Sequence, residues 1–206
     1  MKQLPSKFFL LALLLLYGNY WANAQQFTLE DIKTYPFPTE LTTTGNKIAW
    51  AFDEQGKRNI YVAEAPDFNA RKLTNYSQDD GQELTGVSIS ADGKWVVYVR
   101  GGDHGSNWGD LEPVNPTFNP IPNKVSVWVI PFVGGEPRLY GEGDAPVISP
   151  NSDKVVYLVK GQVWVVPTDG SSEAKNLFTT RGSVGSLQWS PNGNQLAFVA
   201  DRADHD

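Results

Sequence analysis

The chain has 206 residues, and its 23 acidic and 17 basic side chains give it a formal net charge of −6. An acidic chain has no basic surface to neutralise a phosphate backbone, so we expect no nucleic-acid partner. The sequence contains no cysteine, which excludes disulfides, thiolate metal sites and cysteine nucleophiles. With 19 Gly, 14 Pro and 12% aromatic residues, the composition is typical of a folded, β-rich protein.

Residues 1–24 match a secretory signal peptide. Lys2 and Lys7 precede an apolar run of nine residues, Phe8–Leu16, and the small residues Ala22 and Ala24 form the small-x-small motif of a cleavage site before Gln25. An uncleaved membrane anchor is the alternative, but a span needs roughly 20 apolar residues. We therefore expect a bacterial signal peptide with cleavage after Ala24, a secreted or periplasmic location, and no membrane contact afterwards.

A short lead-in, residues 25–37, separates the signal from the rest of the chain. Thr28 and Asp31 have the spacing of a helix capping pair. The sequence therefore predicts one helix here, Thr28–Thr34.

From residue 38 onward the chain repeats itself. Three stretches superpose without a gap, each with a turn of Pro, Asn, Asp or Gly between two short strands: Ser90–Tyr98, Ser149–Tyr157 and Ser190–Phe198. A weaker copy is Gly45–Trp50. Two further shared segments follow the hairpin in the repeats. The first begins at Ile60, Val127 and Val163, and the second begins at Arg71, Pro137 and Lys175. The unit is a β-hairpin followed by two more strands, which makes four strands per repeat.

The spacing of the repeats favours a β-propeller. They begin at Ser90, Ser149 and Ser190, so the spacings are 59 and 41 residues, and the second matches a four-stranded blade of about 40–45 residues. The longer spacing contains an insertion, residues 101–123, which is rich in Gly, Pro and Asn. A β-sandwich also has short strands and tight turns, but it does not repeat one turn sequence at the same place three times.

Several short motifs resemble a known family. They are Phe27–Ile32, Asp79–Thr85, Arg100–Gly105 and Phe198–His205. Together with the repeated Ser-Pro-Asn/Asp-Gly turns, they resemble the TolB-like blades at the N-terminus of secreted bacterial dipeptidyl peptidase IV-like enzymes, in the prolyl oligopeptidase family. The resemblance covers the whole chain after the signal.

This resemblance implies which strands lie inside. The strand before each Ser-Pro turn is the innermost and lines a central channel. On that order the blades cover residues 38–74, 83–140 and 145–178, and a fourth begins at Val184 and is cut after its second strand. The predicted fold is thus all-β, a partial β-propeller of about three and a half four-stranded blades within residues 38–206. Family propellers have about seven or eight blades, so the chain resembles a fragment; a complete small propeller would need four full blades.

Catalytic motifs are absent from the sequence. The family's serine lies in a Gly-x-Ser-x-Gly elbow, and the nearest match, Gly170-x-Ser172, has Ala174 in place of the second Gly. His104 and His205 are the only histidines, and neither has an elbow beside it. We therefore expect no catalytic residue, metal or cofactor in this chain.

Two loops contain candidate substrate-binding residues. Asp79, Asp80 and Glu83 lie between two blades, where the inferred strand order places their carboxylates near the channel mouth. They could bind the amino end of a peptide, as acidic propeller residues do in the resembled enzymes. The alternative is a solvated turn whose Asp side chains cap backbone donors.

The insertion contributes Asp103 and His104, with Trp108, Asp110 and Glu112 further along. A substrate-gating loop fits this mixture better than a metal site, because the spacing matches no metal template. The four tryptophans Trp50, Trp128, Trp164 and Trp189 are expected at equivalent strand positions, in the core between blades.

Two functions remain open at this point. The first is the N-terminal propeller of a secreted serine peptidase, which admits peptide substrates to a hydrolase domain missing from this chain and has no catalysis by itself. The second is a stand-alone periplasmic TolB-like module that binds a protein partner. In either case the open blade edge near Val199 could associate with other chains.

Overall fold

The computed structural model describes residues 28–104 and 118–201. The chain divides into two units between Thr34 and Tyr35. In the first unit, helix α2 (Leu29–Thr34) begins with reciprocal capping: the Asp31 N–H donates to Thr28 Oγ1 at 3.0 Å, and the Thr28 N–H donates to Asp31 Oδ2 at 2.8 Å. None of the helices in the described part is long and apolar enough to cross a membrane. The signal-peptide prediction lies outside the described residues.

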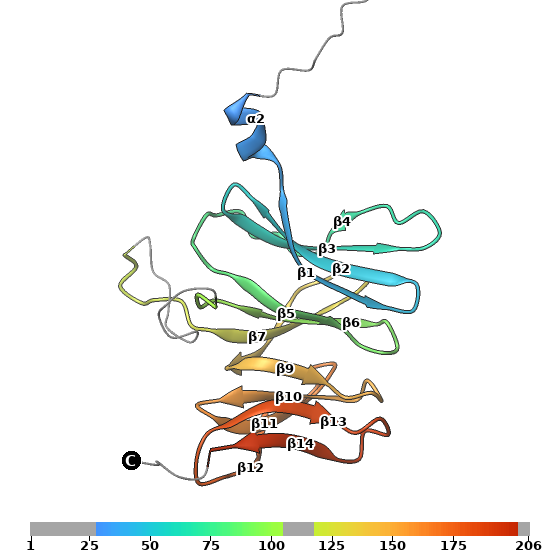
Figure 1. Cartoon of the computed structure of the whole chain (residues 1–206), viewed down its shortest axis with the longest axis vertical. Coiled ribbons are helices and arrows are strands. Elements are labelled where there is room, and N and C mark those ends of the chain that lie inside the picture. Colours follow the sequence, from blue (N-terminus) through green and yellow to red (C-terminus); the bar gives the residue numbers. More distant parts are fainter. Residues whose placement is uncertain (1–27, 105–117, 202–206) are drawn as a thin grey trace, which may run out of the picture. The chain divides into compact units, whose positions relative to one another are not determined.

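The second unit is built from antiparallel sheets in which each strand pairs with the next along the chain (Figure 1). The first sheet contains β1 (Phe37–Thr44), β2 (Lys47–Glu54), β3 (Lys57–Glu64) and β4 (Arg71–Lys72). The second contains β5 (Leu84–Ile89), β6 (Trp95–Arg100), β7 (Ser126–Pro131) and β8 (Arg138–Glu142). The third contains β9 (Asp144–Ile148), β10 (Lys154–Val159), β11 (Gln162–Pro167) and β12 (Lys175–Phe178). The fourth contains β13 (Val184–Trp189) and β14 (Leu196–Ala200).

These sheets are the blades of a partial β-propeller. Three have four strands and one has two within the described residues, so the prediction of about three and a half blades is confirmed. The first strands β1, β5, β9 and β13 contact one another in that order. This arrangement places the first strand of each blade at the inner edge, the position that lines a propeller channel.

The repeated serine explains why the hairpin recurs. Ser90 Oγ donates to Asp92 Oδ1 at 2.6 Å and accepts from the Trp95 N–H at 3.0 Å. In the fourth blade Ser190 repeats these contacts with Asn192 and Gln195, at 2.7 and 3.0 Å. Ser149 likewise accepts from the Lys154 N–H at 3.3 Å in the third blade, so the serine hydroxyl satisfies polar groups of the turn between the first two strands in the second, third and fourth blades.

Each inner strand also has a β-bulge that the sequence analysis did not predict. The bulges contain residues with positive φ: Glu40, Gly86, Ala145 and Ser186. In every blade the bulge lies opposite the aromatic of the second strand: Trp50, Tyr98, Tyr157 and Phe198. A bulge kinks a strand, so every inner strand bends at the same level of the blade.

Apolar layers hold neighbouring blades together. The layer between the first two blades includes Ala49, Ile60, Val62, Val96 and Tyr98, all fully buried. A valine-rich layer with Tyr157 joins the second blade to the third, and a smaller layer joins the third to the fourth. The hydrophobic core therefore consists of separate layers between neighbouring sheets, as stacked blades require.

The prediction that the four tryptophans are equivalent is wrong. Trp128 and Trp164 are equivalent, on third strands opposite Tyr98 and Tyr157. Trp50, however, lies on a second strand opposite Tyr61, and Trp189 ends the inner strand β13. The blades conserve an aromatic pair across the second and third strands, and the first blade exchanges which strand has the tryptophan. All four are buried or half-buried.

Candidate functional site

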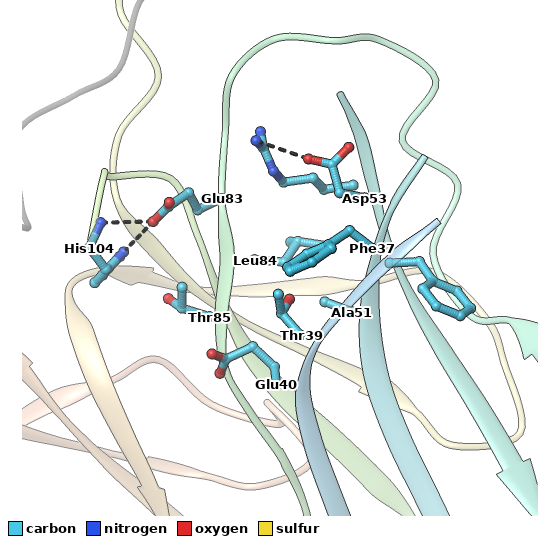
Figure 2. A pocket seen from close by; sticks show the side chains of 11 residues that line it. Phe37, Thr39, Glu40, Ala51, Asp53, Glu83, Leu84, Thr85 and His104 are labelled. Carbon is cyan, nitrogen blue, oxygen red and sulfur yellow. Dashed lines mark hydrogen bonds and ion pairs between the residues drawn. The ribbon is translucent and has the colours of Figure 1, made fainter. Parts of the chain in front are cut away.

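A cavity of about 370 Å³ lies between the first two blades, beside the beginning of the insertion (Figure 2). Strands β1, β2 and β5 form its walls, and the loop after β6 closes one side. Its lining mixes aromatic and charged residues: Phe37, Thr39, Glu40, Ala51, Phe52, Asp53, Arg58, Glu83, Leu84, Thr85 and His104. Two of the predicted substrate-binding residues, Glu83 and His104, therefore line this cavity.

His104 joins three separate segments of the chain. Its backbone N–H donates to Glu83 Oε2 at 2.7 Å, and Nδ1 lies 3.1 Å from the same oxygen. Its other ring nitrogen, Nε2, lies 3.2 Å from Asp144 Oδ2. Glu83 immediately precedes β5 and Asp144 begins β9, so the imidazole bridges the second and third blades.

The two carboxylates change how His104 titrates. Burial alone lowers the pKa of the imidazole, because the charged form loses water. The hydrogen bond with Glu83 and the charge of Asp144 outweigh burial, and the pKa of His104 is raised above its usual value. The protonated ring donates to both carboxylates, whereas a neutral ring turns a lone pair toward one of them.

The opposite wall of the cavity has a second ion pair and the carboxylate of Glu40. Arg58 Nη2 lies 3.1 Å from Asp53 Oδ2 across the hairpin of β2 and β3. Glu40, at the bulge of β1, accepts a long hydrogen bond of 3.4 Å from the Val87 N–H in β5. Figure 2 shows the Asp53 and Glu83 carboxylates on different sides of the cavity. The cavity lining therefore includes positively and negatively charged side chains next to apolar ones.

Asp79 and Asp80 lie in the segment between the blades, outside the cavity lining. Asp80 forms an ion pair with Arg100, and its Oδ1 accepts from the Gln82 N–H at 3.1 Å. Arg100 also stacks over the Tyr76 ring, 4.3 Å from its centroid. The Asp79 carboxylate lies against Gly56, at the turn between β2 and β3. Asp80 thus accepts a hydrogen bond from a nearby backbone N–H, which is the contact predicted if this segment is a solvated turn capped by its Asp side chains.

The structure brings the five predicted residues to the same end of the sheets, yet their binding role stays a prediction. Asp80 and Glu83 already have partners within the chain, and Asp103 is half-buried beside His104. Trp108, Asp110 and Glu112 lie outside the described residues. The described part of the chain has no group of three or more His, Asp or Glu side chains that could hold a metal.

Four residues of this site were not predicted from the sequence: Asp144, Glu40, Arg58 and Asp53. Asp144 meets His104 only because the third blade packs on the second, and no local pattern indicates that contact. Glu40 is positioned by the unpredicted bulge. Asp53 and Arg58 pair across a hairpin, so their opposite charges at facing strand positions are a sequence signal for this ion pair.

The cluster is suited to positioning and not to nucleophilic catalysis. Both ring nitrogens of His104 face carboxylates, so within the described residues neither is available to a serine hydroxyl. A catalytic histidine needs one nitrogen directed at the nucleophile.

The fold is similar to propellers in solved structures, at low sequence identity. A structure from a study of two prolyl endopeptidases superposes with a TM-score of 0.58 and 13% identity, covering 82% of this chain and 27% of that one. The Dos1 propeller gives 0.54 and 12%, covering 78% and 38%. The β-propeller domain of the Trilobed protease from Pyrococcus furiosus gives 0.53 and 16%, covering 75% and 46%.

These similarities show the fold alone. The chain spans between about a quarter and a half of the length of these three structures. No protein-family model and no curated protein matches the sequence.

Proposed function

We propose that this chain is the N-terminal propeller part of a secreted or periplasmic serine peptidase of the prolyl oligopeptidase family. In this proposal the catalytic serine belongs to a hydrolase domain outside residues 1–206, and the propeller controls which peptides reach it. The chain itself performs no catalysis.

The observation that carries the proposal is the partial propeller, whose fold is similar to a much longer prolyl endopeptidase structure and to the propeller of a protease. The sequence motifs that resemble secreted dipeptidyl peptidase IV-like enzymes support the same family. The missing nucleophile elbow and the carboxylate partners of His104 agree with a non-catalytic part.

The geometry supports a gating role through size and charge. A propeller channel lined by inner strands admits short or extended peptides and excludes folded proteins. The cavity of about 370 Å³ beside β1 and β5 is large enough for a small ligand or a few peptide atoms. Its carboxylates Glu40 and Glu83 would favour cationic groups, and Arg58, whose Nη1 is buried without a hydrogen-bond partner, would favour the peptide carbonyls.

Serine reactivity tests the proposal. Residues 25–206 include all of the second unit, Tyr35–Asp206, and should neither cleave chromogenic Xaa-Pro or Ala-Ala substrates nor react with a fluorophosphonate probe. A longer protein that continues this chain should do both, by the acyl-enzyme route. Labelling of any serine within residues 25–206 would contradict the proposal. If the coding sequence stops at codon 206 beside an envelope-complex gene, the TolB-like binding module is favoured instead.

A further inference from the structure

Glu40 differs from its counterparts at the bulges of the later blades. All four bulge residues have a positive φ, between 50° and 58°, but the other three are small: Gly86, Ala145 and Ser186. A residue with a Cβ is strained at such a φ. Of the four described bulges, the first alone has a long, charged side chain at this position. Backbone strain that the fold maintains in this way is typical of functional sites.

The side chain at a bulge is directed toward the inner strand of the next blade. A Cβ at Gly86 would lie 3.4 Å from Pro146 on β9, and the Glu40 carboxylate reaches the Val87 N–H on β5 in the same way. Glu40 thereby lines the cavity of about 370 Å³ between the first two blades. Both of these blades have all four strands, so the walls of the cavity do not depend on how the chain continues.

Glu40 is the lining carboxylate that has no cationic partner in the described part of the chain. Asp53 is paired with Arg58, and Glu83 with His104. The Glu40 carboxylate accepts only the long hydrogen bond of 3.4 Å from β5. Because a carboxylate has two acceptor oxygens, most of its hydrogen-bonding capacity is unused. A carboxylate of this kind beside an apolar wall favours a cationic ligand.

The other side of the cavity calls for an oxygen acceptor. Arg58 Nη1 is buried and has no hydrogen-bond partner among the described residues, which is costly for a polar group. Figure 2 shows the carboxylates of Glu40 and Asp53, the partner of Arg58, on opposite sides of Ala51 and Leu84. Ala51 and Leu84 are each 3% exposed. A ligand that satisfies both sides has a cation and an oxygen acceptor separated by an apolar segment.

We propose that this cavity binds a lysine residue of an extended peptide, with the ammonium at Glu40 and the backbone carbonyl of the same residue at Arg58 Nη1. The apolar stem of a lysine side chain would cover Ala51 and Leu84. In a peptide's terminal residue, the amino group and the carbonyl have no apolar segment between them, so lysine fits better than an amino end. The choice of a peptide as the ligand rests on the proposed function, which this inference deepens by naming the side chain that is selected.

Calorimetric titration of residues 25–206 with short peptides tests the proposal. We expect an acetylated and amidated pentapeptide with a central lysine to bind with a Kd below about 1 mM. The same peptide with norleucine keeps the stem without the charge, and it should bind at least tenfold more weakly, since the charged hydrogen bond to Glu40 is lost. A peptide with a free amino end and no lysine should bind no better than the norleucine peptide. Tighter binding of the free amino end than of the lysine peptide would overturn the proposal.

Variants at the two ends of the cavity assign the contacts. Glu40→Gln should weaken binding of the lysine peptide at least tenfold and leave the norleucine peptide unchanged. Glu136→Gln is the matched control, because Glu136 is exposed on the loop between β7 and β8 and does not line the cavity. Arg58→Lys keeps a positive charge beside Asp53 but loses the planar fork of donors, so it should weaken binding of both peptides by the same factor.

Glu40→Gly separates binding from folding. Glycine adopts a positive φ without strain, so this variant should lose the preference for lysine while its melting temperature does not fall. A melting temperature more than about 5 °C below wild type would identify Glu40 as a structural residue and overturn the proposal. So would a Glu40→Gln chain that still prefers lysine, or a wild-type chain that binds no lysine peptide at about 1 mM. None of these results would alter the serine-reactivity test of the proposed function.

Discussion

The imidazole of His104 lies 3.2 Å from the carboxylate of Asp144, although 40 positions separate them in the sequence. The first belongs to the loop after the second strand of one blade, and the second begins the inner strand of the next. Glu83 holds the other side of the same ring. A single titratable side chain therefore joins two blades at the end of the channel where the insertion begins.

We predict that this bridge makes stability depend on pH. The pKa of His104 is raised in the folded state by Glu83 and Asp144, above an unfolded value of about 6.5. The added stability is fully present below the unfolded pKa and is lost as pH rises through the folded pKa. The melting temperature of residues 25–206 should therefore fall as pH rises from about 6 to 8.

Variants at the two histidines isolate this effect. His104→Gln should make the melting temperature vary less with pH, and it should lower the melting temperature mainly at the acidic end of this pH range. His205→Gln, at the other histidine, should keep the wild-type profile. Identical slopes for wild type and His104→Gln would show that the bridge does not stabilise the fold.

Gly143 precedes Asp144 and should tolerate no side chain. Its φ is +149°, and a Cβ there would come within 2.5 Å of the Leu158 carbonyl oxygen and 2.7 Å of the Tyr157 ring. Gly143→Ala should cost about 3 kcal/mol of unfolding free energy, from backbone strain and steric overlap together. Gly134 has a φ of +108° with no atom within 4 Å of its Cβ position, so Gly134→Ala should cost only about 1 kcal/mol. Urea denaturation measures both, and equal losses would contradict the close approach.

The apolar layer between the first two blades should contribute most of the stability of these two blades. Ile60 is fully buried in it, whereas Ile121 is 81% exposed. Ile60→Ala should destabilise the fold by about 2–5 kcal/mol, since it removes buried apolar contacts and leaves a cavity. Ile121→Ala should change stability by less than about 0.5 kcal/mol. Chemical denaturation followed by tryptophan fluorescence compares them, and a small loss for Ile60→Ala would mean that the blades do not pack as described.

Glu83 allows a kinetic test of peptide recognition in a longer, active protein. If its carboxylate binds the amino end of a peptide, Glu83→Gln should raise KM about tenfold for peptides with a free amino end and leave N-acetylated peptides unchanged. His104→Gln removes the imidazole beside Glu83 but keeps the carboxylate, so it should preserve the preference for a free amino end. An equal KM change for both peptide types would assign Glu83 to the scaffold alone.

The blades could be predicted from the repeats because each repeated turn sequence indicates a local β-hairpin. Ser90, Ser149 and Ser190 begin equivalent turns, and the strands around them form as expected. The bulges at Glu40, Gly86, Ala145 and Ser186 were not predictable, since they involve four different residue types with no shared local signal. A bulge arises from pairing with the second strand, and that pairing depends on tertiary packing.

The candidate site was predictable only in part for the same reason. Glu83 and His104 were chosen from acidic and Gly-rich loops, and the structure brings them together. Asp144 could not be chosen, because its role depends on how two blades pack. The tryptophans were predicted to be equivalent, but the first two blades place the tryptophan of the aromatic pair on different strands. Trp50 is on the second strand of its blade, whereas Trp128 is on the third.

The most direct test of the central claim is the mass and serine reactivity of the native protein. An antibody against residues 25–206 should be used to isolate it from the source cells and their medium after treatment with a fluorophosphonate probe. Our account predicts a polypeptide longer than 206 residues, labelled on one serine outside this chain. An unlabelled protein no longer than this chain would contradict it.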